Sequence, residues 1–252
     1  MKRIVIIPTY NECENVARMT DKVMSLDGAF DLLYVDDGSP DGTADIIRAK
    51  IAEYGDRVHL VERSGKLGLG TAYIAGFKWA LERGYDEIFE MDCDFSHNPD
   101  DLLRLASRLE SDADVAIGSR YVKGMNVVNW PLSRILISYG ASLYVRMVTR
   151  MPIYDSTAGF VGYKAEVLRT IDLDKIRMIG YGFQIEMKYT AWRHGFCLRE
   201  ESIVFTDREL GTSKMSSSIF GEAFFGVMKL PFRKIVRSEE LGARSEELGI
   251  RS

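Results

Sequence analysis

Cysteine, histidine and proline are scarce in this chain, and long apolar runs are missing. Three of the 252 residues are cysteines and three are histidines. The cysteines are widely spaced and odd in number, which excludes a disulfide framework and fits a reducing compartment. No run approaches the roughly 18 apolar residues that span a bilayer. The first apolar run reaches Pro8 too early for a signal peptide, so we expect a cytoplasmic protein.

The chain also lacks an excess of basic residues. Lys and Arg number 33 against 37 Asp and Glu, which gives a net charge of −4. A general nucleic-acid-binding protein usually carries a basic face, so no nucleic-acid partner is expected. Hydrophobic residues make up 46% and charged residues 28%, as in an ordinary globular protein with room for one large α/β domain.

Short apolar runs alternate with helical patterns through the first half of the chain. The runs are rich in Ile and Val, as buried parallel strands are. This alternation predicts a doubly wound α/β fold, with a mostly parallel central sheet and helices on both faces. The predicted strands are Ile4–Ile7, Leu32–Val35, Val58–Val61, Ile88–Met91 and Val115–Ile117. The predicted helices are Asn15–Met24, Thr43–Tyr54, Ala72–Glu82 and Asp100–Leu109.

The second half is less regular. Strands are predicted at Phe160–Tyr163 and Ser202–Phe205, and a helix at Gln184–Arg193. Two further segments, Leu132–Val148 and Ile219–Val236, read as amphipathic helices that either pack on the core or lie in a membrane interface. A seven-residue repeat closes the chain, but two copies with a glycine in each are too few for a coiled coil. We expect residues 237–252 to form a disordered tail.

Asp92 and Asp94 follow the fourth predicted strand and are the most informative residues. Alternate residues of an extended chain point the same way, so both carboxylates can face one point beyond the strand end. Such hard oxygen ligands suit Mg²⁺ or Mn²⁺, which also bind substrate phosphates. The alternative is an acidic turn in solvent. It is disfavoured because other polar motifs follow strand ends too, where ligands bind in such sheets.

Three of these motifs follow the first, second and third predicted strands. Tyr10 offers a ring that can stack on a nucleobase, and Asp37 offers a carboxylate for a base or ribose. The segment 39–42 after Asp37 is typical of a tight turn and helix cap. The third strand is followed by a glycine-rich segment, 63–70, which opens a helix. That segment either contacts a phosphate or serves as a structural turn.

Eight motifs stand along the chain: IPTYNE at 7–12, VDDGSPDGT at 35–43, KLGLGTAY at 66–73, MDCDFSHNP at 91–99, GSRY at 118–121, STAGF at 156–160, GYGFQIEM at 180–187 and FTDRELGTSKM at 205–215. In this order they resemble the family 2 glycosyltransferases with a GT-A fold, and within them the dolichyl- or polyprenyl-phosphate mannose synthases. The resemblance covers roughly residues 2–230. Its most specific motifs are GSRY, STAGF and the segment DRELGTSK.

The resemblance implies a role for each matching position. A guanosine pocket is implied at Pro8, Tyr10, Glu12, Val35 and Asp37. The metal and diphosphate segment is Asp92, Cys93 and Asp94, with Asp92, Asp94 and Ser96 as metal ligands. Arg120, Arg208 and Lys214 are implied to bind the donor diphosphate and the incoming phosphate, and Arg134 and Ser138 the acceptor phosphate. For His97 a solvated or supporting position is favoured over a catalytic one.

The resemblance also implies an activity. The chain is expected to be an inverting, metal-dependent transferase that moves mannose from GDP-mannose to a polyprenyl phosphate. A phosphate monoester is mostly dianionic at pH 7, so no general base is assigned. One alternative is a polyprenyl-phosphate glucosyltransferase or another family 2 enzyme that uses a UDP-sugar. Another is a nucleotide-sugar-binding protein without turnover.

A lipid substrate implies contact with a membrane. We expect peripheral attachment to a cytoplasmic membrane face, through interfacial helices or a membrane-anchoring protein partner. The expected domain spans residues 1–236. Its nucleotide-sugar half is 1–120 and its acceptor- and membrane-facing half is 121–236.

Overall fold

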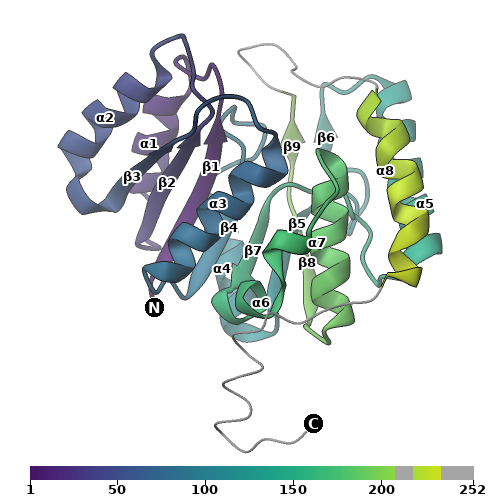
Figure 1. Cartoon of the computed structure of the whole chain (residues 1–252). Helices are drawn as coiled ribbons and strands as arrows, with labels where there is room; N and C mark the ends of the chain where they lie inside the picture. The colour runs from purple at the N-terminus through teal and green to yellow at the C-terminus, as the bar shows by residue number, and fades with distance from the viewer. Residues whose placement is uncertain (208–217, 234–252) are drawn as a thin grey trace, which may run out of the picture.

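A computed structural model describes residues 1–207 and 218–233 of the chain. Within these residues seven strands form one sheet in the order β3-β2-β1-β4-β7-β5-β8 (Figure 1). All neighbours are parallel except β7, which runs antiparallel to β4 and β5. The predicted, mostly parallel sheet is therefore confirmed. The strands are β1 Arg3–Thr9, β2 Phe30–Asp36, β3 Val58–Glu62, β4 Glu87–Glu90, β5 Val115–Ser119, β7 Val161–Lys164 and β8 Leu198–Ser202.

Helices cover both faces of the sheet because side chains alternate along each buried strand. In β1, Ile4 and Ile6 pack in one hydrophobic cluster, and Val5 and Ile7 pack in the other. The first cluster includes α3 (Leu69–Glu82), α6 (Ala165–Thr170) and α7 (Tyr181–Arg193). The second includes α1 (Val16–Met24), α2 (Thr43–Tyr54) and α4 (Asp101–Ser111). Because both faces are buried, the strands read as continuous apolar runs.

The reversed direction of β7 follows from the path of the chain after β5. A parallel neighbour needs a crossover that returns the chain to the opposite edge of the sheet. After β5 the chain instead forms β6 (Val127–Val128) near the carboxyl ends of the strands and α5 (Leu132–Thr149) at one end of the molecule. It re-enters the sheet from that edge as β7 (Figure 1). Residues after β5 therefore lie close to the motifs that follow the earlier strands.

The prediction of a strand at Ser202–Phe205 is wrong in its bounds. β8 ends at Ser202, and β9 (Phe205–Thr206) pairs with β6 in a separate two-stranded sheet. β8 lies at the end of the main sheet and contains three consecutive charged residues, Arg199, Glu200 and Glu201. Its charge hides it from a search for apolar runs.

Two helices, α5 and α8 (Ser218–Lys229), lie side by side at one end of the molecule (Figure 1). The ring of Tyr144 in α5 stacks on Phe224 in α8 at 4.5 Å, and its hydroxyl donates to the Phe224 carbonyl at 3.0 Å. The predicted α5 is confirmed. The last helix ends at Lys229, earlier than predicted, and residues 234–236 lie outside the described residues. None of the helices within 1–207 and 218–233 combines the length and apolar character needed to cross a bilayer.

Candidate active site

The carboxyl ends of the strands bring the predicted motifs to one edge of the sheet. In the parallel register of β1 and β2, Pro8 is opposite Val35 and Thr9 is opposite Asp36. The amide of Asp37 donates to the Thr9 carbonyl at 3.0 Å, which continues the pairing beyond the strands. The motifs after these two strands therefore lie side by side.

The two adjacent aspartates at the end of β2 have different surroundings. The Asp36 carboxylate is buried and accepts hydrogen bonds from Thr9 Oγ1 at 2.9 Å and from the Ser39 amide and hydroxyl at 2.9 and 2.6 Å. These bonds hold the turn that follows the strand. Asp37 instead pairs with Arg63, with 2.5 Å between a guanidinium nitrogen and the carboxylate. Of the two aspartates, Asp37 is thus the one that lies beside the end of β3, which Arg63 directly follows.

The other predicted donor residues divide between the surface of the site and the core. Tyr10 is partly exposed, and the Lys66 ammonium lies 5.1 Å from its ring centre. The amide of Glu12 donates to Thr43 Oγ1 at 2.9 Å. Val35 is completely buried in the hydrophobic core, where its side chain packs and meets no solvent.

The glycine-rich segment before α3 forms a structural turn. Gly68 has a φ of +102°, which an L side chain rarely adopts. Arg63 donates to Thr71 Oγ1 at 2.8 Å and to the Gly68 carbonyl at 3.3 Å, and so ties this turn to β3. Of the two expected roles for this segment, the structural turn is therefore present. Contact with a phosphate stays a prediction.

The Asp92–Ser96 segment lies beyond the end of β4 at Glu90. It bends, so the two-residue alternation of a strand does not extend over it. The Asp92 side chain is 42% exposed, whereas Asp94 is buried and accepts hydrogen bonds from the Ser96 amide at 3.1 Å and from the Ser96 hydroxyl. Phe95, which lies between Asp94 and Ser96, has a φ of +58°, a strained value for a bulky residue.

The oxygen atoms of this segment fit a hard divalent cation. Carboxylate and hydroxyl oxygens are the donors that Mg²⁺ and Mn²⁺ prefer. Among the residues that the structure describes, no three His, Cys, Asp or Glu side chains gather as a metal-binding group. A cation bound here would therefore complete its coordination with water or substrate oxygens.

His97 follows the acidic segment and is buried rather than solvated. Its ring stacks on Phe160 at 5.0 Å and meets Phe205 edge-on at 5.2 Å. Burial lowers its pKa to about 4, so the ring is neutral at neutral pH. Its Nδ1 lies 3.9 Å from the nearer carboxylate oxygen of Asp92. Of the two positions expected for His97, the solvated one is wrong, and the buried ring lies in a supporting position beneath the segment.

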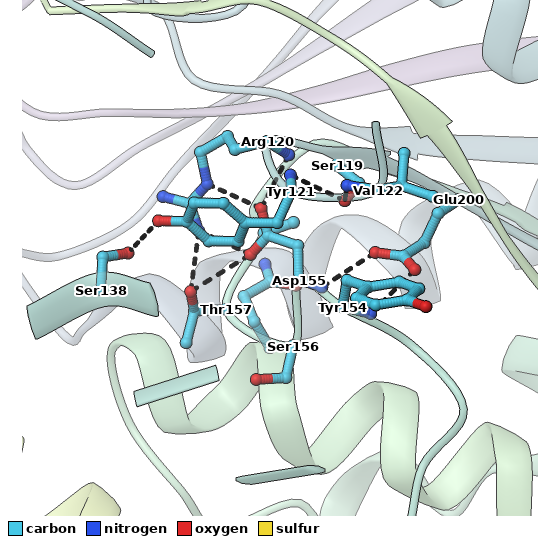
Figure 2. A network of polar contacts seen from close by, with 12 residues as sticks. Ser119, Arg120, Tyr121, Val122, Ser138, Tyr154, Asp155, Ser156, Thr157 and Glu200 are labelled. Atoms are coloured by element: carbon cyan, nitrogen blue, oxygen red, sulfur yellow. Dashed lines mark hydrogen bonds and ion pairs between the residues drawn. The ribbon is translucent and has the colours of Figure 1, made fainter. Parts of the chain in front are cut away.

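Arg120 directly follows β5 and is also buried (Figure 2). Its Nε and Nη2 donate to the two carboxylate oxygens of Asp155 at 2.7 and 2.6 Å, and Nη2 also donates to Thr157 Oγ1 at 2.8 Å. Burial alone would lower the pKa of Arg120, but Asp155 raises it well above the usual value. The ion pair therefore fixes a permanent positive charge at the strand end.

Arg134 and Ser138 lie four residues apart in α5 and so share a helix face. Arg134 is 40% exposed, and its Nη1 donates to Asp207 at 3.0 Å. The Tyr121 hydroxyl donates to Ser138 Oγ at 2.8 Å, which joins α5 to the segment after Arg120 (Figure 2). The structure thus brings Arg134 and Ser138 to the same edge as Arg120. The predicted Arg208 and Lys214 lie outside the described residues.

A buried polar network beneath this edge was not predicted. Lys188 of α7 is fully buried and donates to the Ala158 carbonyl at 2.6 Å and to the Gln184 carbonyl at 3.2 Å. Gln184 Nε2 in turn donates to Glu90 at 2.9 Å. Burial lowers the pKa of Lys188 and raises that of Glu90. The network links the end of β4 to the segment that follows Asp155.

Sequence reasoning missed both Asp155 and Lys188. Asp155 stands immediately before the STAGF motif, so its position was a usable signal. Lys188 directly follows the GYGFQIEM motif, which is a similar signal, but a lysine in a helix is ordinarily a solvated residue.

A cleft of about 550 Å³ opens beside the acidic segment. The Arg18 guanidinium lies 4.9 Å from the Phe95 ring centre. Lys22 pairs with Asp100 at 2.6 Å, which neutralises its charge. The cleft is lined by Arg18, Lys22, Phe95, Asn98, Pro99, Val204 and Thr206.

Known proteins resemble this chain along most of its length. It is 46% identical over 232 residues to a polyprenol monophosphomannose synthase of Mycolicibacterium smegmatis, covering 92% of this chain and 88% of that protein. It is 48% identical over 229 residues to an undecaprenyl-phosphate mannosyltransferase of Micrococcus luteus, covering 91% and 93%. A dolichol-phosphate mannosyltransferase of Pyrococcus furiosus is 34% identical, covering 91% of this chain and 64% of that protein.

The fold has counterparts among solved structures. A glucosyl-3-phosphoglycerate synthase from Mycobacterium tuberculosis, solved with Mn²⁺, UDP and glucosyl-3-phosphoglycerate, aligns with a TM-score of 0.65. The alignment covers 92% of this chain and 78% of that one at 15% identity, so it bears on the fold alone. Residues 4–172 match the family described as Glycosyl transferase family 2. The chain therefore belongs to glycosyltransferase family 2.

Proposed function

We propose that this protein transfers a mannosyl group from GDP-mannose to the phosphate of a polyprenyl lipid. The observation that carries the proposal is the edge where a carboxylate-bearing segment, a buried arginine and a half-exposed arginine meet. These are the charges that two phosphorylated substrates require. The identity of 46–48% to polyprenyl-phosphate mannosyl enzymes over nearly the whole chain supports the lipid acceptor.

The donor nucleotide is assigned to the ends of β1 and β2. The Tyr10 ring offers a face for the base, and Asp37, held by Arg63, offers a carboxylate to base or ribose donors. Lys66 beside Tyr10 adds a positive charge near the path of the diphosphate. Arg120 holds its charge at the end of β5 through the bidentate pair with Asp155, and the two therefore act as one unit.

Asp92, Asp94 and Ser96 are assigned to hold Mg²⁺ or Mn²⁺. Such a cation, when bound, supplies Lewis-acid neutralisation of charge on the departing nucleoside diphosphate. The Asp94–Ser96 hydrogen bonds give these residues a fixed shape before substrate arrives. His97 excludes water from beneath the segment.

The acceptor phosphate is assigned to Arg134 and Ser138. Its second pKa lies near 6, so at pH 7 the phosphate is its own nucleophile and needs no base. One phosphate oxygen bonds to the anomeric carbon as the bond to the donor diphosphate breaks on the opposite side. An α-linked mannosyl donor then gives a β-linked lipid phosphate. The protein contributes position and charge, which suffice for such a displacement.

The lipid acceptor requires contact with a membrane, and α5 and α8 are assigned to it. Exposed apolar side chains of α5 include Leu136 at 61% and Met147 at 65%, and Phe225 of α8 is 64% exposed. An amphipathic helix of this kind lies in the bilayer interface with its apolar face inward. The protein is therefore proposed to be peripheral on the cytoplasmic face, with a membrane-anchoring partner as a further possible contact.

Transfer assays with the purified protein test the proposal. GDP-mannose, UDP-glucose and UDP-galactose are each incubated with a short polyprenyl phosphate, with and without Mn²⁺ or Mg²⁺. We expect a mannosyl lipid from GDP-mannose with the metal, and little product without it. A preference for a UDP-sugar would replace the donor assignment, and binding without turnover in every case would refute the enzyme assignment.

The Arg134→Ala variant tests the acceptor assignment. It removes a charge-assisted contact to the lipid phosphate, so we expect the acceptor KM to rise about tenfold or more, about 1.4 kcal/mol. The donor KM should change less than twofold. An equal loss for both substrates would contradict the acceptor role.

A further inference from the structure

A group of aromatic rings lies between the two arginines of the site. The Arg134 guanidinium carbon lies 4.0 Å from the ring centre of Trp130. That of Arg120 lies 5.6 Å from Trp130, 5.7 Å from Phe205 and 5.2 Å from Tyr121. The contact between Arg134 and Trp130 is by far the shortest, within the range where a ring face attracts a cation.

Trp130 is itself fixed on two sides. Its ring meets Phe205 edge-on at 5.3 Å, and Phe205 belongs to β9, which pairs with β6, a strand that ends two residues before Trp130. The next residue is Pro131, which restricts the backbone of Trp130 to extended conformations and stands at the start of α5. The ring is therefore a rigid platform placed by the backbone at the first turn of α5.

The indole nitrogen of Trp130 indicates that the ring is not there for stability alone. Nε1 is buried and has no hydrogen-bond partner in the part of the chain that the structure describes. A buried N–H without a partner destabilises the fold, and a phenyl ring would avoid this cost. A large indole face in this place is better explained by what lies on it, which is the Arg134 guanidinium.

Arg134 needs such a platform because its side chain is long and half-exposed. Free rotation about its bonds would spread the guanidinium over many positions. The Trp130 ring centre lies 4.0 Å from its guanidinium carbon, and Asp207 accepts a hydrogen bond from Nη1 at 3.0 Å. With the described residues this side chain makes no other hydrogen bond, so further N–H donors of the fork remain for a phosphate.

We propose that Trp130 is a positioning residue for the lipid acceptor: its ring holds the Arg134 guanidinium in place for the incoming phosphate. This inference rests on the proposed function, since it assigns Arg134 to the acceptor. It adds a residue that contacts neither substrate in the assigned roles but sets the geometry of one that does. Removing the ring should weaken the acceptor and leave the donor unaffected.

Two substitutions of Trp130 in the full-length protein test the inference. Trp130→Leu removes the ring face, and Trp130→Phe keeps a smaller one with a weaker attraction for a cation. We expect the acceptor KM to rise about tenfold for Leu, equivalent to about 1.4 kcal/mol, and about threefold for Phe. The donor KM should stay within twofold in both. An unchanged acceptor KM in Trp130→Leu, or equal rises for donor and acceptor, would overturn the proposal.

Trp79 supplies a matched control. It lies in the last turns of α3, and the Arg83 guanidinium carbon lies 3.9 Å from its ring centre, so it forms a similar arginine–tryptophan pair away from the strand ends that form the site. Trp79→Leu should leave both KM values unchanged. If it raises the acceptor KM as much as Trp130→Leu does, the effect is a general loss of structure and the proposal is wrong.

A double substitution separates positioning from packing. If Trp130 acts through Arg134, Trp130→Leu should add nothing to the acceptor KM of Arg134→Ala. A full additive effect would mean that Trp130 acts independently.

Tryptophan fluorescence gives a second readout: titration with polyprenyl phosphate should change the emission of the wild type and of Trp79→Phe, but not of Trp130→Phe. If the wild type binds no polyprenyl phosphate, the proposed function fails. If it binds and transfers while Trp130→Leu behaves as wild type, only the positioning role fails.

Discussion

At the scale of single residues, partners decide what a charged side chain can do. Asp36 and Asp37 are neighbours of the same type, yet Asp36 is occupied by the turn after β2 and Asp37 lies beside Arg63 at the site. Arg120 and Arg134 differ in the same way. The first is buried against Asp155 and the second is half-exposed on Trp130. Breaking the buried pair by removing one partner would destabilise the protein strongly, because a buried charge would be left alone.

Asp94→Asn gives a sharp residue-scale prediction. An asparagine oxygen can still accept the hydrogen bonds from the Ser96 amide and hydroxyl, so the segment should keep its shape. The negative charge that the proposed metal site requires is lost. We expect turnover to fall by about a hundredfold or more, with a free energy of unfolding within about 1 kcal/mol of wild type.

Asp100→Asn serves as the control for that measurement. Asp100 lies a few residues after Asp94 in the chain, is exposed, and pairs with Lys22. Its loss should leave turnover within twofold, because an exposed ion pair contributes little. Near-normal turnover in Asp94→Asn would refute the metal assignment.

The sequence predicts site residues where a motif follows a strand end, and fails where burial decides. Asp92, Asp94 and Arg120 follow β4 and β5 as expected. Val35 was placed in a nucleotide pocket by resemblance, but it lies in the core. Lys188 could not be found from its own pattern, because its partners are backbone carbonyls that only the folded chain brings together. Whether the predicted residues bind substrate stays a prediction.

At the scale of elements, Asp41 links the start of α2 to a segment of the candidate site. The Asp41 carboxylate accepts from the Thr43 amide at 3.1 Å, from the Thr43 hydroxyl at 2.6 Å and from the Cys13 amide at 3.1 Å. It therefore ties the segment after β1 to the first turn of α2. Partial burial acts to raise the pKa of Asp41, but these hydrogen bonds outweigh it and lower the pKa to about 2.

This lowered pKa predicts how stability changes with pH. The folded state binds a proton at Asp41 less readily than the unfolded state, whose pKa is near 3.8. The stabilisation is therefore complete above the unfolded pKa and is lost as pH falls toward about 2. Asp41→Asn should be less stable than wild type at pH 7 by about 1 kcal/mol, a modest value because the residue is exposed. Urea unfolding at pH 7, 4 and 3 should show the difference shrinking at the lowest pH.

Asp27→Asn is the comparison for this series. Asp27 is exposed and makes no side-chain hydrogen bond within the described part of the chain. Asp27→Asn should match wild type in urea unfolding at pH 7, because no hydrogen bond of the described residues is lost. A constant difference between Asp41→Asn and wild type at all three values would contradict the role of the carboxylate at the start of α2.

Elements were predictable where their periodicity was strong. The parallel strands and the helices between them follow from apolar runs and amphipathic patterns. The strand β7 was also predicted, but its antiparallel direction was not, because that direction depends on where the chain returns after α5. The strand predicted at Ser202–Phe205 missed most of β8, because an edge strand with three charged residues has no apolar signature.

At the scale of the whole molecule, the sheet with its helices is one body, and α5 and α8 extend it on the acceptor side. Helices that cover the sheet turn their large apolar residues inward. In α5 the buried residues are small or few, namely Ser142, Val145 and Thr149, whereas several large apolar residues face outward. Exposed apolar area of this kind, close to the residues assigned to a lipid phosphate, is what the proposed membrane contact requires.

The paired substitution Leu136→Ser and Ile137→Ser tests that side. Both residues are about equally exposed, at 61% and 60%, so the change should leave the folded structure intact. Each substitution removes apolar area that would enter the interface. The variant should therefore bind vesicles of phosphatidylglycerol at least tenfold more weakly than wild type. Turnover with a short, water-soluble acceptor should stay within twofold, because the strand ends are untouched. Leu103→Ser in α4, on the sheet face opposite α7, removes a leucine that is 39% exposed and should change neither quantity. If vesicle binding survives the paired substitution, α5 is not the membrane contact, and the acceptor must reach Arg134 from another direction.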